Sequence, residues 1–302
     1  ADSGDWARRI QKAHQTFDAA RQTWVTGERC PLFDPNDGIA WYAFQANAYA
    51  ADRRDWFEPE AFRIAPVFRR LGQLLPELKT VSGIEGRIAK LMNGGRSQPD
   101  DGLYELLVAG AYKCRAWTAV EFVPEQPGVT KTHDLMVSSG RRHWAVECKR
   151  VNRSGYEAAE YDHGLRIAGY VHDLCRARKC SLVVAVSYKV ELSEVGDTYL
   201  AERAEDFLAD PRRTDWSDSV SQGRMRPVDW RLARAVLEHD DIFFGSSRMV
   251  ELLVGTEMPN FDHSVAADWT PAPQRPFHAT AMSQASVVSW RSTSPNAAKR
   301  KA

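Results

Sequence analysis

Cysteine is scarce in this sequence, with five residues among 302, and their number is odd. That density is far below the density of a small secreted domain held together by disulfides, so this class is excluded and a reducing compartment is expected. Cys175 and Cys180 lie close to His172 along the chain. No second Cys/His pair stands nearby, so the sequence does not predict the four ligands of a structural zinc site.

Long apolar runs, a secretion signal and an excess of charge of one sign are also absent. No run approaches the ~20 residues that span a bilayer, and residues 1–6 lack the basic region and apolar core of a signal peptide. Lys plus Arg and Asp plus Glu are equal, at 40 each, so any site for a polyanion must be a local patch. We therefore expect a cytoplasmic protein without a membrane partner.

Internal repeats and the Gly-rich loops that cradle nucleotide phosphates are missing too, which argues against ATP hydrolysis by this chain. What is present is an ordinary globular composition, 43% hydrophobic and 26% charged. A chain of this length can form two or three domains with apolar cores.

Residues 1–98 predict an all-helical N-terminal domain. Apolar residues recur at the three- and four-residue steps of a helix that buries one face, namely Trp6, Ile10, Ala13, Phe17, Ala20 and Trp24. Further helices are expected over 39–51, 62–75 and 84–92. Their basic residues leave two interpretations open, a solvated surface or a phosphate-facing side: Arg63, Arg69, Arg70, Arg87 and Lys90.

Residues 99–193 predict a second domain in the order helix, three strands, helix, strand. The first helix covers 103–112 and the first strand 114–123. A helical stripe over 161–175 precedes the continuous apolar run at 182–186, which is typical of a buried strand. This order predicts the α/β fold class.

Two strands in the middle of this domain carry ionisable residues that strands usually avoid. The segments 132–137 and 144–150 are joined by 138–142, which has the composition of a hairpin turn. Glu147 and Lys149 are two residues apart, so on a strand they project from one face, while Trp144, Val146 and Cys148 project from the other. The hairpin can bring Glu147 beside Asp134. We therefore expect one face of these strands to pack against the protein and the other face to carry the reactive side chains.

The order of elements, with an acid in the first helix, Asp134 at the second strand and Glu147-x-Lys149 on the third, resembles the PD-(D/E)XK nucleases, the restriction-endonuclease-like superfamily. The resemblance covers residues 101 to about 190 and identifies no subfamily. Glu105 matches the family's helix acid, and His133 stands at the variable position where the family name has Pro. The resemblance implies an αβββαβ core sheet flanked by helices.

The resemblance also implies a divalent-metal-dependent nuclease. Phosphodiester hydrolysis requires neutralisation of negative charge and an activated water, and hard cations supply both. Mg²⁺, for which Mn²⁺ can substitute, would be held by Asp134, Glu147 and the backbone carbonyl of Cys148, with Glu105 on a metal-bound water or a second metal. Lys149 would orient or deprotonate the attacking water.

The Glu-x-Lys string by itself is weak evidence, because Glu77-Leu78-Lys79 carries it too. That second match follows a helical segment and has no hairpin before it, so the context of Glu147 distinguishes the two. The alternative interpretation of the strands is an exposed hairpin in which Glu147 and Lys149 form a solvated pair, with a stabilisation of roughly 0.2–1 kcal/mol.

DNA is the expected partner. Arg150 and Arg153, next to the proposed metal, and Arg141 and Arg142, at the turn, are the predicted nucleic-acid-binding residues. RNA remains an alternative substrate because nothing in the sequence identifies or excludes recognition of a 2′-hydroxyl. The sequence leaves open a homodimer or a partner protein.

Residues 194–302 predict a C-terminal extension of helices with added strands. The expected elements are helices over 199–208 and 230–237, strands over 249–254 and 287–290, and a polar loop over 211–227. These strands extend the nuclease sheet or form a small domain of their own.

Three functional hypotheses follow from the sequence. The first is a DNA endonuclease acting in restriction, anti-phage defence or repair. The second is a catalytically silent nucleic-acid-binding module on the same fold, and the third is a helical interaction protein with an incidental hairpin. The first is favoured because a silent relative has no reason to retain Asp134, Glu147 and Lys149 together.

Overall fold

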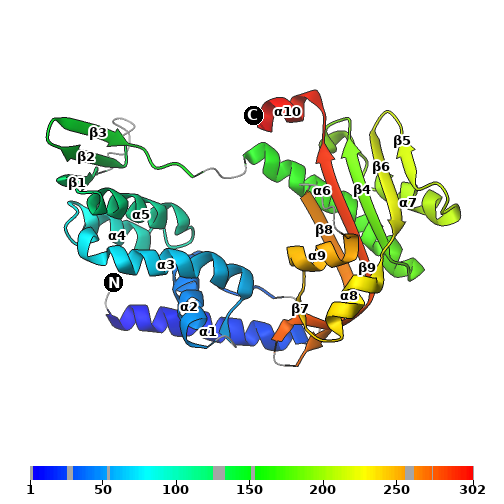
Figure 1. The fold of residues 1–302 in the computed structure, drawn as a ribbon, viewed down its shortest axis with the longest axis horizontal. Helices are drawn as coiled ribbons and strands as arrows, with labels where there is room; N and C mark the ends of the chain where they lie inside the picture. Colours follow the sequence, from blue (N-terminus) through cyan, green and yellow to red (C-terminus); the bar gives the residue numbers. More distant parts are fainter. Residues whose placement is uncertain are drawn as a thin grey trace. The chain divides into compact units, whose positions relative to one another are not determined.

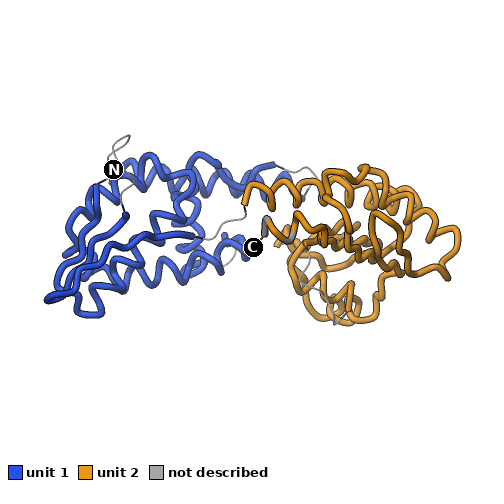
Figure 2. Tube along the Cα trace, turned by 90° about the horizontal axis from the view of Figure 1, so that it is seen from above, with its two compact units in different colours: residues 1–151 blue, residues 152–302 orange. Residues whose placement is uncertain are grey.

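The computed structural model describes residues 3–25, 30–52, 55–124, 133–150, 154–255, 262–273 and 275–301. The chain divides into two compact units, Ala1–Val151 and Asn152–Ala302, which Figure 2 shows in different colours. None of the helices in the described ranges is both long and apolar enough to cross a membrane.

The first unit begins with helices that pack around aromatic side chains. They are α1 (Ser3–Val25), α2 (Gly38–Ala51, after the 3-10 turn η1 at Pro35–Asp37), α3 (Glu58–Leu78), α4 (Ile84–Met92) and α5 (Asp100–Cys114). Phe17 of α1 lies 5.3 Å from Trp41 and 5.9 Å from Phe44 of α2, between ring centroids. Such aromatic pairs add to the burial of apolar surface, so the predicted helical stripe on α1 has its partner in α2.

A three-stranded antiparallel sheet follows these helices, formed by β1 (Ala119–Phe122), β2 (Leu135–Ser139) and β3 (Arg142–Val146) (Figure 1). Ser139 pairs with Arg142, and Gly140 adopts a φ of 59° at the turn, as a tight hairpin requires. β3 is the edge strand, and Trp144 is 51% exposed, in contact with Trp117. The expected packed face of β3 is therefore wrong at Trp144, because none of the described elements buries this side chain.

The second unit is a six-stranded mixed sheet with helices on both faces. Its strands have the order β5-β6-β4-β9-β7, with β8 paired to β9, and β4 and β9 are parallel. The elements are α6 (Gly155–Arg178), β4 (Leu182–Tyr188), η3 (Leu192–Glu194), α7 (Tyr199–Ala209), β5 (Asp215–Ser217), β6 (Ser221–Pro227), α8 (Trp230–Leu237), β7 (Ile242–Phe243), α9 (Ser247–Val254), β8 (Asp262–Ala272), β9 (Arg275–Ser292) and α10 (Pro295–Lys301).

Alternation along β4 divides this unit into two apolar layers. Val184 and Val186 pack with α6 and α7, whereas Val183 packs with α8 and α9 on the other side of the sheet. Since side chains of a strand alternate between faces, a strand buried on both faces appears in sequence as the continuous apolar run that predicted it (Figure 1).

The expected mixture of helices and sheets is confirmed, but the restriction-endonuclease-like core is not. The predicted core spans both compact units, with α5 and β1–β3 in the first and α6 and β4 in the second. In the structure β4 pairs with β6 and β9, so β1–β3 and β4 do not belong to one sheet.

Two local expectations in the C-terminal part are wrong. The polar segment 211–227 contains β5 and β6 rather than a loop, because seven successive residues of β6 pair with β4 despite weak strand propensity. The segment 249–254 belongs to helix α9, where the Ser246 side chain accepts the backbone N–H of Met249 and caps the helix. The strand expected over 287–290 is confirmed as part of β9.

Gly164 of α6 provides a stability test of the layer between α6 and the sheet. A Cβ at Gly164 would lie 2.0 Å from Trp290 Nε1, whereas a Cβ at Gly169 of the same helix meets nothing within 4 Å. We expect Gly164→Ala to lower the free energy of unfolding by about 1–3 kcal/mol through overpacking. The matched Gly169→Ala should raise it by about 0.5–1 kcal/mol through helix propensity. Equal effects in urea denaturation would contradict this packing.

His172 of α6 predicts a dependence of stability on pH. Its ring nitrogens face the hydroxyls of Ser286 at 2.7 Å and Ser264 at 3.0 Å, and burial lowers its pKa to about 4 from 6.5. Between pH 4 and pH 6.5 the unfolded chain therefore binds a proton at His172 that the folded chain does not. The contribution of neutral His172 to the free energy of unfolding is complete above pH 6.5 and is lost as the pH falls towards 4.

We expect wild type to lose about 3 kcal/mol more than His172→Gln between pH 6.5 and pH 4. Urea denaturation at a series of pH values measures the difference. The His172→Gln variant is the reference, because the glutamine side chain does not titrate. Parallel curves for the two proteins would show that His172 does not carry this dependence.

Candidate functional site

The hairpin register brings Asp134 towards Glu147. The last paired residues are Leu135 and Val146, so Asp134 precedes β2 and Glu147 follows β3 at the same end of the hairpin. The Asp134 backbone N–H donates to the Val146 carbonyl at 3.0 Å, and its carbonyl accepts the Val123 N–H at 3.0 Å. Asp134 is thus held by its backbone between the ends of the two neighbouring strands.

The side chain of Asp134 connects the two segments of the motif directly. Its Oδ2 accepts the backbone N–H of Cys148 at 2.6 Å. A hydrogen bond to a carboxylate is stronger than one between neutral groups, so this contact fixes the segment after β3 beside Asp134. The predicted strand to residue 150 is corrected here, because β3 ends at Val146 and residues 147–150 run beyond the ladder.

Glu147 and Lys149 lie on this segment near one another. Lys149 Nζ is 4.0 Å from Glu147 Oε1, and the two side chains are 71% and 35% exposed. An exposed pair at this distance contributes little stability, so Lys149 can exchange this contact for one with a substrate at little cost.

Glu105 of α5 is held by a buried ion pair. Its Oε2 lies 2.9 Å from Arg87 Nη1, with both side chains largely buried, and the Arg87 guanidinium stands 5.1 Å from the centre of the Phe122 ring. From the sequence, Arg87 was expected on a solvated surface or on a phosphate-facing side, because its local pattern does not show that α4 presents it to α5. The same arginine lines a cavity of about 270 Å³ with Lys90, Val123 and Pro124 among its other walls.

The Cys148 thiol reports the electrostatics of this region. The pKa of this thiol is raised to about 12, chiefly by burial, with Asp134, Glu105 and Glu147 also raising it and Arg87 opposing them. The thiol stays protonated at neutral pH. The carboxylates act on one point, and the negative potential there favours a cation.

The oxygen donors suit Mg²⁺ in chemical type, with carboxylates at Asp134 and Glu147 and the backbone carbonyl of Cys148 directly after Glu147 in sequence. The three acids of the motif do not bring ligand atoms within 4.8 Å of one another in the described ranges. The group that does so there is His14, Asp18 and Asp55 in the helical part.

The group of His14, Asp18 and Asp55 already lies beside a positive charge. Arg21 Nη1 lies 3.7 Å from Asp18 and 3.6 Å from Asp55. The guanidinium neutralises these carboxylates as a cation would, so the group is explained as a surface ion-pair network.

The predicted nucleic-acid-binding arginines differ in their surroundings. Arg150 Nη1 lies 3.4 Å from Asp100 and 3.4 Å from Asp101 at the start of α5. Arg141 and Arg142 are exposed at the hairpin turn, and Arg153 lies outside the described residues. Arg141 and Arg142 are therefore accessible to a polyanion, whereas Arg150 must exchange its carboxylate partners for phosphate.

Comparisons with protein-family models, curated proteins and solved structures find no match to this chain. The resemblance to the PD-(D/E)XK nucleases therefore depends on the motif residues and their order alone.

The pair of Arg87 and Glu105 predicts a strong and non-additive effect on stability. Glu105→Ala leaves a buried guanidinium without its carboxylate partner, and we expect a loss of about 3–5 kcal/mol in the free energy of unfolding. The double variant Arg87→Met/Glu105→Leu should lose far less, because it removes both charges. Chemical denaturation of both singles and the double measures the coupling, and additive losses would contradict a structural ion pair.

Proposed function

We propose that the chain is a divalent-metal-dependent nuclease that hydrolyses DNA phosphodiester bonds, as an endonuclease in restriction, anti-phage defence or repair. The observation that carries the proposal is the hydrogen bond from the Cys148 N–H to Asp134 Oδ2. This bond joins Asp134 to the segment that carries Glu147 and Lys149, so these three residues stand at the same end of one hairpin.

A phosphodiester resists hydrolysis because its charge repels nucleophiles. Asp134, Glu147 and the Cys148 carbonyl would hold a Mg²⁺ ion, which Mn²⁺ can replace, and Glu105 would act through a bound water or a second ion. When bound, the metal would neutralise the charge that develops on the phosphate and lower the pKa of an attacking water.

The protein residues have separate tasks in this reaction. Attack by water forms one P–O bond and breaks another. The attacking water must therefore lose a proton, to Lys149 or to solvent, and the leaving oxygen must take one from solvent water. Lys149 Nζ is exposed and lies near Glu147, so it can hold the attacking water and support the phosphate charge. Arg87 orients Glu105 through their 2.9 Å contact.

A restriction-endonuclease-like core would place β4 in the sheet of β1–β3, and what supports it is the order α5, β1, β2, β3, α6, β4 along the chain. The pairing of β4 with β6 and β9 instead stands against it.

A catalytically silent nucleic-acid-binding module is the second candidate function. It is favoured by the Glu105 carboxylate, which is occupied by Arg87, and by the separation of the motif acids beyond the 4.8 Å of a compact ligand group. On this alternative the hairpin and its arginines bind nucleic acid and no bond is broken.

Cleavage assays separate the two candidates. We expect wild type to cleave supercoiled, linear, single-stranded or branched DNA with Mg²⁺ or Mn²⁺ and to stop with chelator, with RNA as a parallel substrate. Asp134→Ala and Lys149→Ala should each reduce the rate at least about 100-fold, through loss of charge stabilisation and of water activation respectively.

The second Glu-x-Lys string supplies a matched control. Lys79 is exposed at the end of α3, and Lys79→Ala removes the same charge as Lys149→Ala without touching the hairpin. Its rate should equal that of wild type. Cleavage that persists in Asp134→Ala or in the presence of chelator would refute the metal-dependent mechanism. Binding of nucleic acid without cleavage under every metal condition would support the silent module.

A further inference from the structure

The second unit carries arginines on the sheet face against which α8 and α9 pack, beside these helices. Arg224 and Arg226 of β6 and Arg291 of β9 form what we call the arginine trough. One cavity of about 450 Å³ is lined by Arg224 and Arg226, and a second of about 470 Å³ is lined by Arg224 and Arg291. The cavities share Arg224 and Ala185, so the trough is longer than a single small-anion site.

The floor of the trough is made of small residues. Ala185 of β4 pairs with Arg224 on one side and with Ser289 on the other, so these three share a face of the sheet. At Gly223 a Cβ would lie 2.2 Å from the Trp216 ring, so only glycine leaves room for that ring, and both residues line the second cavity. Small floor residues leave room for a chain to lie across the strands.

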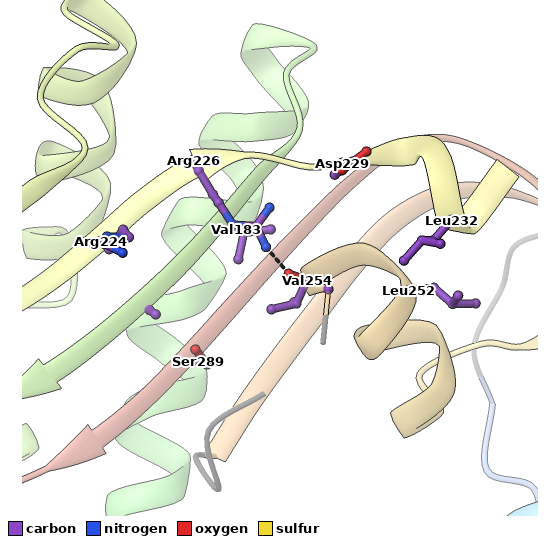
Figure 3. A pocket seen from close by; sticks show the side chains of 10 residues that line it. Val183, Arg224, Arg226, Asp229, Leu232, Leu252, Val254 and Ser289 are labelled. Carbon is purple, nitrogen blue, oxygen red and sulfur yellow. Dashed lines mark hydrogen bonds between the residues drawn. The ribbon is translucent and has the colours of Figure 1, made fainter. Parts of the chain in front are cut away.

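The guanidinium groups are positioned by fixed acceptors. Arg226 extends from β6 to the Val254 carbonyl at the end of α9, as Figure 3 shows. Arg291 Nε donates to the Ser187 hydroxyl at 2.9 Å, and Arg224 Nε donates to Asp215 at 2.7 Å in an exposed pair. The carbonyl and the hydroxyl are neutral acceptors that orient Arg226 and Arg291. Arg224 and Arg226 also face carboxylates, Asp215 and Asp229 respectively, which a phosphate would have to replace.

We propose that the arginine trough binds the phosphodiester backbone of a nucleic acid strand. Arg224 and Arg226 are two residues apart, about 6.6 Å along a strand, which suits successive phosphates of an extended backbone. Arginine offers planar, bidentate donors that match phosphate oxygens. Because the whole chain has no net charge, such a local patch is where a polyanion would be attracted. The choice of nucleic acid over other polyanions rests on the proposed function.

The trough is tested by binding measurements on the full chain in chelator, where cleavage does not occur. Fluorescence anisotropy of labelled single-stranded DNA, duplex DNA and RNA is recorded over a range of salt concentrations. Arg224→Ala/Arg291→Ala should weaken the preferred ligand about tenfold and reduce the slope of log K against log salt by roughly 1.5–2, as two lost phosphate contacts require. Arg226 is left intact because it holds α9.

Arg176→Ala/Arg178→Ala is the matched control, since it removes two exposed arginines from α6, which packs on the opposite face of the sheet. It should bind as wild type does. Unchanged melting temperatures show that the variants fold.

Each outcome decides between the trough and the cleavage site. Equal affinity of the trough variant and wild type for every nucleic acid, or no binding by wild type, overturns the trough. Equal losses for nucleic acid and for polyaspartate overturn the choice of ligand. Binding that depends on the trough in a wild-type protein that never cleaves with metal leaves the trough standing and refutes the proposed function.

Discussion

The hydrogen bond between Asp134 Oδ2 and the Cys148 N–H is the constraint on which the candidate site depends. β3 is an edge strand that ends at Val146, so no ladder positions the residues after it. A bond to a charged acceptor contributes about 1.5–3 kcal/mol, enough to fix a short segment that would otherwise fray. The carboxylate thus holds Glu147 and Lys149 within reach of itself.

The hairpin end and the arginine trough differ in charge and therefore have different expected tasks. The charged side chains around Cys148 are mainly acidic, and Arg87 forms an ion pair with Glu105 inside the protein. We therefore expect that site to bind a cation. On the sheet of the second unit, Arg226 and Arg291 are oriented by neutral acceptors and favour an anion. A chain with no net charge can in this way present one local site for a metal and another for a phosphate backbone.

The sequence was most informative where a residue's local pattern reflects its packing. The 3.6-residue stripe on α1 and the continuous apolar run of β4 predicted those elements because each buries its side chains against neighbours. β6 was missed because its polar residues are held by pairing with β4, a contact distant in sequence. The partner of Glu105 was missed for the same reason, since only the packing of α4 on α5 brings Arg87 to it. Whether the motif residues act as a catalytic set stays a prediction.

The central claim is that the hairpin end holds a divalent cation, and direct measurement of Mn²⁺ binding by electron paramagnetic resonance tests it best. Asp134→Asn should abolish the tight binding of wild type, while Asp18→Asn, in the other acidic group of the first unit, should leave it unchanged. Retention of binding in Asp134→Asn, or its loss in Asp18→Asn, would contradict the account.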